Sequence, residues 1–93
     1  MSSSYAMKLK AMRKAEKLTQ AAMSSVTGVG LSTIKNYETQ GVEIGLSVIE
    51  RVLSAQVFQK YTLWLMTDKT APEAGQIAPA IAHIGQEKII SNR

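Results

Sequence analysis

One stretch of the chain, from Thr19 to Glu38, limits what the rest can fold into, because it holds two short helical patterns about a single turn signal. Thr19 is a good helix cap, since its hydroxyl can accept a hydrogen bond from a free N–H of the first turn. Apolar residues then share one helical face, at Ala22, Met23 and Val26. Gly28 stands where a helix end favours positive φ. These signals predict a short amphipathic helix that ends at a tight corner.

A second helical pattern begins directly after this corner, at Gly30 or Leu31, with Val29 as an apolar plug between the two patterns. Ile34 and Tyr37 are three residues apart, so both are expected to point inward. The outward face is then short, polar and cationic, and it consists of Leu31, Ser32, Lys35 and Asn36. A tight corner that holds such a helix is the geometry of a helix-turn-helix whose second helix enters the major groove of DNA.

The positive charge of the chain gathers on the half that contains this motif. The formal net charge is +4 over 93 residues. Residues 1–35 carry six Lys or Arg against one acid, which gives +5, whereas residues 36–93 carry five against six, which gives −1. A basic surface favours a polyanion, here double-stranded DNA, as the partner. A membrane partner is not expected, because no amphipathic stretch pairs these charges with an exposed apolar stripe.

The sequence lacks the residues that several classes of function require. The chain has no cysteine, which excludes disulfides and thiolate metal sites and fits a reducing cytoplasm. The start, MSSSYAMKLK, lacks the apolar core of a secretion signal, and the apolar run around LWLM is far shorter than the ~18 residues of a membrane span. His83 is the only histidine, and no suitably spaced partner for catalysis or metal binding accompanies it. We expect an intracellular protein that is not an enzyme and holds neither metal nor cofactor.

Helices are also expected on both sides of the motif. The first runs from about Tyr5 to Lys17 after a cap at Ser4, with Leu9 and Met12 inward. Its lysines are expected to be exposed, either as a solvated face or as phosphate contacts: Lys8, Lys10, Lys14 and Lys17. After a loop from Thr39 to Gly45, a fourth helix runs from about Leu46 to Ala55. Its inner face is predicted to consist of Leu46, Ile49, Val52 and Leu53.

A fifth helix, from about Val57 to Met66, is apolar nearly all round and must be covered on two sides. This domain can cover one side and a second copy the other; alternatively, Phe58 and Trp64 are ordinary core residues of a monomer. An apolar content of 45% in so small a chain favours the homodimer. We assign the interface to the fifth helix and to a crossing segment within residues 74–81, namely to Phe58, Tyr61, Trp64, Leu65 and Ile77.

The character of the chain changes after Met66, where two prolines and small residues end continuous helix. Residues 77–81 are either extended or, from Pro79, the start of a short helix. Residues 86–93 look like a frayed terminus. The prediction is therefore all-α: a compact five-helix DNA-binding domain over residues 1–66, which includes the dimerising fifth helix. A short extended or irregular C-terminal tail, which contacts the partner in part, follows over residues 67–93.

Two stretches carry a resemblance to known proteins. The stretch from Leu9 to Gly41 closely resembles the helix-turn-helix of the Cro and lambda-repressor superfamily, through Leu18, Thr19, Gln20, Thr27, Gly28, Val29, Ser32, Thr33, Ile34, Tyr37 and Glu38. The stretch from Lys60 to Gln86 is similar to the C immunity repressors of temperate phages of the P2 group. The resemblance implies a lambda-repressor-like domain that represses transcription as a symmetric homodimer. It also implies that this repressor maintains lysogeny at an operator of the early lytic promoter, in the bacterial cytoplasm and on the nucleoid.

The resemblance also gives roles to individual residues. Gln20 matches the position that reaches the DNA backbone beside the groove, and Arg13 and Glu38 match an internal ion pair, which we interpret as structural. Base readout would fall to the outward face, with Asn36 suited to adenine, Lys35 to guanine or phosphate, and Leu31 to a thymine methyl group, beside Ser32. Thr33 is either a backbone contact or an ordinary residue of the helix start.

A different class of protein could use the same fold, since fold alone does not fix function. The alternative is an antitoxin, or another DNA-binding regulator that works with a protein partner. The resemblance of the tail favours the free-standing repressor, for which an antirepressor protein is a possible partner.

Overall fold

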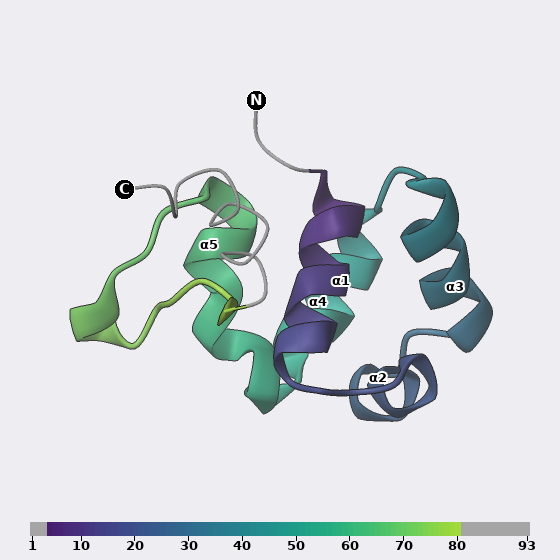
Figure 1. Ribbon diagram of the computed structural model, residues 1–93, viewed down its shortest axis with the longest axis horizontal. Coiled ribbons are helices and arrows are strands. Elements are labelled where there is room, and N and C mark those ends of the chain that lie inside the picture. The colour runs from purple at the N-terminus through teal and green to yellow at the C-terminus, as the bar shows by residue number, and fades with distance from the viewer. Residues whose placement is uncertain (1–3, 81–93) are drawn as a thin grey trace, which may run out of the picture.

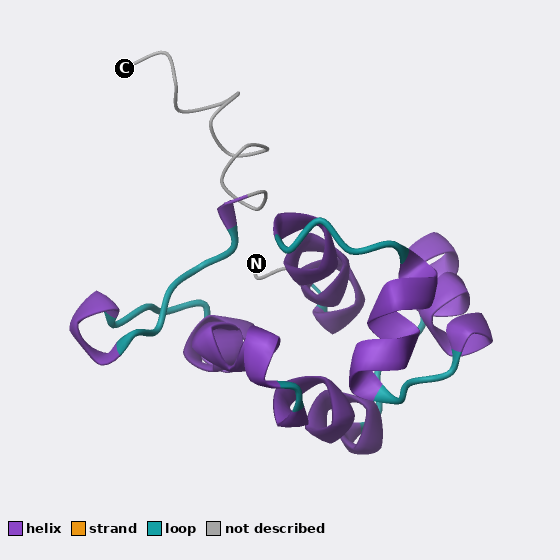
Figure 2. Cartoon of the chain, turned by 90° about the horizontal axis from the view of Figure 1, so that it is seen from below, coloured by secondary structure: helices purple, strands orange, loops and turns teal. Residues whose placement is uncertain are grey.

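Helix α1 (Tyr5–Ala15) lies between the helix-turn-helix on one side and α5 on the other (Figure 1). The computed structural model describes residues 4–80. After α1 come α2 (Gln20–Thr27), α3 (Leu31–Gln40), α4 (Leu46–Ser54), the 3₁₀-helix η1 (Gln56–Tyr61), α5 (Thr62–Thr67) and the 3₁₀-helix η2 (Pro72–Ala74). Over these residues the chain forms helices and loops without a strand, and the segment around η2 extends away from the other helices (Figure 2). The predicted all-α class is confirmed.

The helix ends follow the local signals of the sequence. The Ser4 hydroxyl accepts a hydrogen bond from the Met7 N–H at 3.2 Å, and the Thr19 hydroxyl accepts one from the Ala22 N–H at 3.0 Å, so both predicted caps are confirmed. Gly28 has φ of 80° and ends α2, as expected of a glycine at a helix end. Helix α1 stops at Ala15, before its predicted end, because Lys17 adopts a left-handed conformation with φ of 59°.

One core joins all five α-helices and η1. It contains the predicted Leu9, Met12, Met23, Val29, Ile34, Tyr37, Ile49 and Val52, together with Phe58, Tyr61 and Leu65. Two predictions of inward residues were wrong, since Val26 and Leu46 are exposed. In α2 the inward position next to Met23 belongs to Thr27, whose hydroxyl donates to the Met23 carbonyl oxygen at 2.8 Å. A polar residue can take this core position because a backbone carbonyl satisfies its hydroxyl.

The predicted fifth α-helix is divided into two parts. A 3₁₀-helix forms its first half, η1, and only Thr62–Thr67 is α-helical. In a 3₁₀-helix, residues three apart lie on the same side, so Phe58 and Tyr61 enter the core together. Residues 77–79 have no regular secondary structure and residue 80 is helical, so of the segment that the sequence left open between extended and helical only residue 81 lies outside the described residues.

Lys8 is buried, which contradicts the expectation that it is exposed. Its ammonium group contacts the Asp68 carboxylate at 2.6 Å and donates hydrogen bonds to the carbonyl oxygens of Leu65 at 3.0 Å and Trp64 at 3.2 Å. A cation is favourable there because the last carbonyl groups of a helix have no partner within the helix. Lys8 therefore fastens α1 to the end of α5.

No helix over residues 4–80 is long and apolar enough to span a membrane.

Replacing Lys8 should loosen this attachment. We expect Lys8→Met to lower the free energy of unfolding by about 1–3 kcal/mol, because it leaves the carbonyl oxygens and Asp68 without their donor. Urea unfolding followed by circular dichroism measures this change. Lys14→Met, an exposed site on the same helix, is the control and should change the stability by less than about 0.5 kcal/mol. Equal effects at the two sites would contradict a role for the Lys8 contacts.

Candidate nucleic-acid interface

Two inward side chains fix the orientation of α3. Ile34 and Tyr37 are 0% and 1% exposed, and the Tyr37 hydroxyl lies 4.0 Å from the Met23 sulfur of α2. Burial raises the pKa of the Tyr37 phenol, so this side chain stays neutral. Because the two residues are one helical turn apart, α3 cannot rotate without removing one of them from the core. The opposite side of α3 is therefore turned to solvent.

The solvent side of α3 carries the four residues that the sequence predicted as base contacts, together with Thr33, which was left open between a DNA backbone contact and an ordinary residue of the helix start. Ser32, Thr33, Lys35 and Asn36 are exposed, and Leu31 is half-buried at the start of the helix. We call these five residues the α3 face. It offers a hydroxyl pair, an amide and an ammonium group on consecutive turns, which are the donors and acceptors that read base edges. The structure thus brings all five predicted residues of α3 to one helix.

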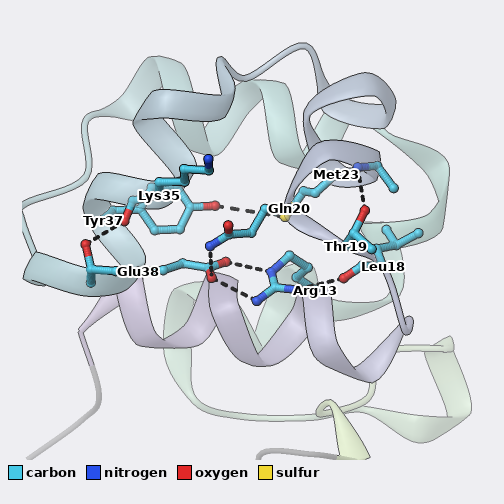
Figure 3. A network of polar contacts seen from close by, with 10 residues as sticks. Arg13, Leu18, Thr19, Gln20, Met23, Lys35, Tyr37 and Glu38 are labelled. Atoms are coloured by element: carbon cyan, nitrogen blue, oxygen red, sulfur yellow. Dashed lines mark hydrogen bonds and ion pairs between the residues drawn. The ribbon is translucent and has the colours of Figure 1, made fainter.

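A bidentate ion pair lies beside the α3 face (Figure 3). Arg13 of α1 donates to Glu38 of α3 from Nε at 2.7 Å and from Nη2 at 2.8 Å, and its Nη1 donates to the Leu18 carbonyl oxygen at 2.7 Å. The Glu38 side chain is only 2% exposed. Burial alone would raise the pKa of Glu38, but the hydrogen bonds from Arg13 and Gln20 outweigh it and lower that pKa. The pair therefore stays charged and joins α1, the loop after it, and α3.

Gln20 belongs to the same network. Its amide nitrogen donates to Glu38 Oε1 at 2.9 Å, from the first residue of α2 (Figure 3). One amide N–H is used in this way, which leaves the second N–H and the amide oxygen for another partner. The family resemblance implied that Gln20 reaches the DNA backbone. Its link to Glu38 could not be predicted, because the two residues are 18 positions apart. Glu38 thus orients the side chain that is expected to reach DNA.

A basic hollow of about 340 Å³ separates α1 from the C-terminal end of α3. It is lined by Ala6, Met7, Lys10, Ala11, Lys14, Tyr37, Glu38 and Gly41. From the sequence, Lys10 and Lys14 could belong either to a solvated face or to a set of phosphate contacts. The structure shows that both line one hollow next to the Arg13–Glu38 pair. Helical spacing indicates that they share a side of α1, but not which element lies opposite.

The residues predicted for a dimer interface do not form one exposed surface. Phe58, Tyr61 and Leu65 are 0%, 3% and 0% exposed, so the core of the single chain already buries them. The Tyr61 hydroxyl, for example, donates to Glu16 of the same chain at 2.5 Å. Trp64 is half-buried and Ile77 is 40% exposed, so these two keep surface for a partner. The assignment of the three buried residues to an interface was wrong, because a fully packed side chain has no area left to offer.

The remaining predictions concern the segment that was expected to cross to a partner, His83, and metal binding. The Ile77 N–H donates to the Lys60 carbonyl oxygen at 2.9 Å, so this part of the crossing segment returns to its own chain. Residue 81 and His83 lie outside the described residues. Among residues 4–80 no group of three or more His, Asp or Glu side chains is placed to hold a metal ion.

The fold and the α3 face define a small helix-turn-helix domain of the lambda-repressor-like class. Residues 9–55 match the helix-turn-helix family model. The chain is 42% identical to Repressor protein C of Escherichia phage P2 over 91 residues, which cover 98% of this chain and 92% of that protein. The chain therefore belongs to the helix-turn-helix family and, within it, to the phage C repressors, which confirms the resemblance of both stretches.

A solved structure supports the fold. The structure of Pf6r, from the filamentous phage Pf6 of Pseudomonas aeruginosa PA01, matches with a TM-score of 0.68 over 85% of this chain and 99% of that chain. The two sequences are 19% identical, so this similarity concerns the fold alone.

Removing the charge of Glu38 should destabilise the domain. We expect Glu38→Gln to lower the free energy of unfolding by about 1–3 kcal/mol, because Arg13 loses its charged partner in a mostly buried position. Thermal melting at pH 7 measures this loss, and Glu43→Gln in the exposed loop after α3 is the control. An unchanged melting curve for Glu38→Gln would reject the structural role of the pair.

The difference in stability between the wild type and Glu38→Gln should depend on pH. The pKa of Glu38 is lowered in the folded state, so its contribution is complete above its unfolded pKa of about 4.3 and is lost as the pH falls through the lower folded value. The melting temperatures of wild type and Glu38→Gln should therefore converge in acid below about pH 4. A constant difference from pH 7 down to pH 3 would contradict this origin.

Proposed function

We propose that this chain is a sequence-specific transcriptional repressor that binds double-stranded DNA as a homodimer and maintains phage lysogeny from an operator at the early lytic promoter. The observation that carries the proposal is the α3 face, which has four exposed polar side chains beside the half-buried Leu31, on a helix whose orientation is fixed by the buried Ile34 and Tyr37. The family supports it, since a relative with 42% identity bears the name Repressor protein C.

The residues of the α3 face suit different base edges. In the major groove, Asn36 can form a bidentate pair with adenine, Lys35 can donate to guanine O6 and N7, and Leu31 can pack on a thymine methyl group. Ser32 can donate or accept at either base of a pair, and Thr33 sits at the helix start, where a hydroxyl reaches a phosphate. Since each good bidentate pair is worth about 1–3 kcal/mol of discrimination, these few side chains are enough to distinguish an operator.

Phosphate contacts would hold α3 in register. Gln20 and the free N–H groups at the start of α2 can bind one phosphate beside the groove. The basic hollow adds Lys10 and Lys14 on the neighbouring helix. Because Glu38 is already paired with Arg13 and Gln20, its charge repels a phosphate less than a free carboxylate would.

The second copy would supply the second recognition helix. Two α3 helices that enter successive major grooves must lie about 34 Å apart. The bacterial cytoplasm and the nucleoid are where such an operator lies, and an antirepressor protein is a possible further partner that would release the promoter.

The proposal is tested by footprinting the protein on the DNA that flanks its own gene. We expect a protected site of about two half-sites and an affinity that falls steeply with salt. The absence of a protected site, together with the capture of a tight protein partner without DNA, would favour the antitoxin alternative instead.

Asn36→Ala should relax sequence discrimination. We expect a loss of about 1–3 kcal/mol for the operator, roughly 5- to 150-fold in affinity, and no change for non-specific DNA. Fluorescence anisotropy on both kinds of duplex at one salt concentration measures this. Gln40→Ala, at the exposed end of α3, is the control and should bind like the wild type. An equal loss on both duplexes would mean that Asn36 contacts phosphate rather than a base.

Lys14→Ala should act on every DNA sequence alike. If Lys14 neutralises one phosphate, the slope of log affinity against log salt should become less steep by about 0.9. The exposed Lys69, beyond α5, is the matched control, and Lys69→Ala should leave the slope unchanged. A Lys14→Ala slope equal to that of the wild type would remove the basic hollow from the DNA interface.

A further inference from the structure

The corner between α2 and α3 depends on side chains for its hydrogen bonds. The Val29 N–H donates to the Thr27 hydroxyl at 3.1 Å, and the Val29 carbonyl oxygen accepts from the Ser24 hydroxyl at 2.6 Å. Both of these partners belong to α2. The Gly28 carbonyl oxygen accepts instead from Nη1 of Arg51, at 3.0 Å, and over residues 4–80 no backbone N–H donates to it. Arg51 therefore supplies the hydrogen bond that joins this corner to α4.

The place of Arg51 suits a cation. Gly28 ends α2, and the last carbonyl groups of a helix have no partner within the helix and carry partial negative charge. Arg51 lies in the last turn of α4, its side chain is exposed, and none of the ion pairs over residues 4–80 involves it. No carboxylate in this part of the chain thus competes with Gly28 for the guanidinium group.

The two ends of α3 are held in different ways. Near its C-terminal end, Glu38 accepts two hydrogen bonds from Arg13 of α1. At its N-terminal end the cap residue is Gly30, which has no side chain to donate or accept a capping bond. The buried Val29 packs this end against the core, but apolar packing has no preferred direction. The hydrogen bond from Arg51 adds the direction that packing alone lacks.

The position of this end of α3 matters most for base readout. Leu31 and Ser32 follow Gly28 by only three and four residues, so a displaced corner displaces both of them. Hydrogen bonds to base edges require donor–acceptor distances of about 2.7–3.2 Å and good alignment. Long, flexible lysine side chains can follow a phosphate through a small displacement, because an ammonium group acts as a point charge. A displaced corner should therefore weaken base contacts and spare phosphate contacts.

We propose that Arg51 is a positioning residue for base readout, which fixes the start of α3 through the Gly28 carbonyl group and does not itself contact DNA. This inference rests on the proposed function. Two arginines then hold the reading helix from opposite sides, Arg13 of α1 near its C-terminal end and Arg51 of α4 at its start.

The test is Arg51→Met, which keeps the length of the side chain and removes its donors and charge. Loss of an exposed hydrogen bond of this kind should lower the population of the reading geometry, and hence the affinity for the operator, by about threefold to tenfold. Affinity for a non-specific duplex should stay within about twofold of the wild type, and the slope of log affinity against log salt should not change. Fluorescence anisotropy of the full chain on both duplexes, over a series of salt concentrations, measures these quantities.

Lys69→Met is the matched control, because it removes the same charge from an exposed site beyond α5. It should bind both duplexes like the wild type, and thermal melting checks that both variants are folded at the temperature of the assay. An Arg51→Met variant with the operator affinity of the wild type would overturn the proposal. So would an equal loss on both duplexes with a slope less steep by about 0.9, since Arg51 would then be a phosphate contact.

A measurement without DNA separates this inference from the proposed function. In NMR spectra of the free protein, the backbone amide signals of Leu31 and Ser32 should move in Arg51→Met and stay in place in Lys69→Met. Unchanged signals in Arg51→Met would overturn the proposal whatever the binding data show. A wild type that prefers no duplex would contradict the proposed function, whereas moved signals would still show that Arg51 places the start of α3.

Discussion

The Arg13–Glu38 ion pair is the interaction on which the geometry of the candidate interface depends. It ties α1 to α3 through two short hydrogen bonds, and the same carboxylate receives the amide of Gln20 from α2. A mostly buried ion pair is weak evidence of net stability, because desolvation offsets much of the attraction. Its value here lies in orientation. An apolar replacement could preserve the packing, but it would leave Gln20 without the acceptor that directs it.

The positive charge left free on the candidate interface is smaller than the net charge of the N-terminal half. On α1, Lys8 and Arg13 are both held by carboxylates and carbonyl groups of the same chain, at the end of α5 and beside α3. Lys10 and Lys14 remain at the basic hollow, and Lys35 remains on the α3 face. Arg13 therefore positions α3 and Lys8 fastens α1 to α5, so only the other cations are free for the proposed phosphate contacts. Composition counts all of them alike, but only contacts across the fold separate the two roles.

Local signals explain which parts of the fold could be predicted from the sequence. Thr19, Gly28, Ile34 and Tyr37 act within a turn or two of their own position, so the helix-turn-helix and the residues of its outward face follow from spacing alone. Lys8 could not be predicted, because its partners lie 56 and 57 residues away at a helix end. Likewise, periodicity showed that α4 is amphipathic, but it could not show how wide a stripe the core would cover.

The predicted fifth helix shows that an apolar segment does not always need a second copy to cover it. A segment that is apolar nearly all round was expected to need cover from a second copy, but a 3₁₀ start places Phe58 and Tyr61 on one side, and the core of the single chain covers both. The apolar content of the chain still exceeds what this core buries over residues 4–80. The excess is spread over several helices, at Met7 of α1, Val26 of α2, Leu46 of α4 and Met66 of α5, so it does not by itself mark one covered face.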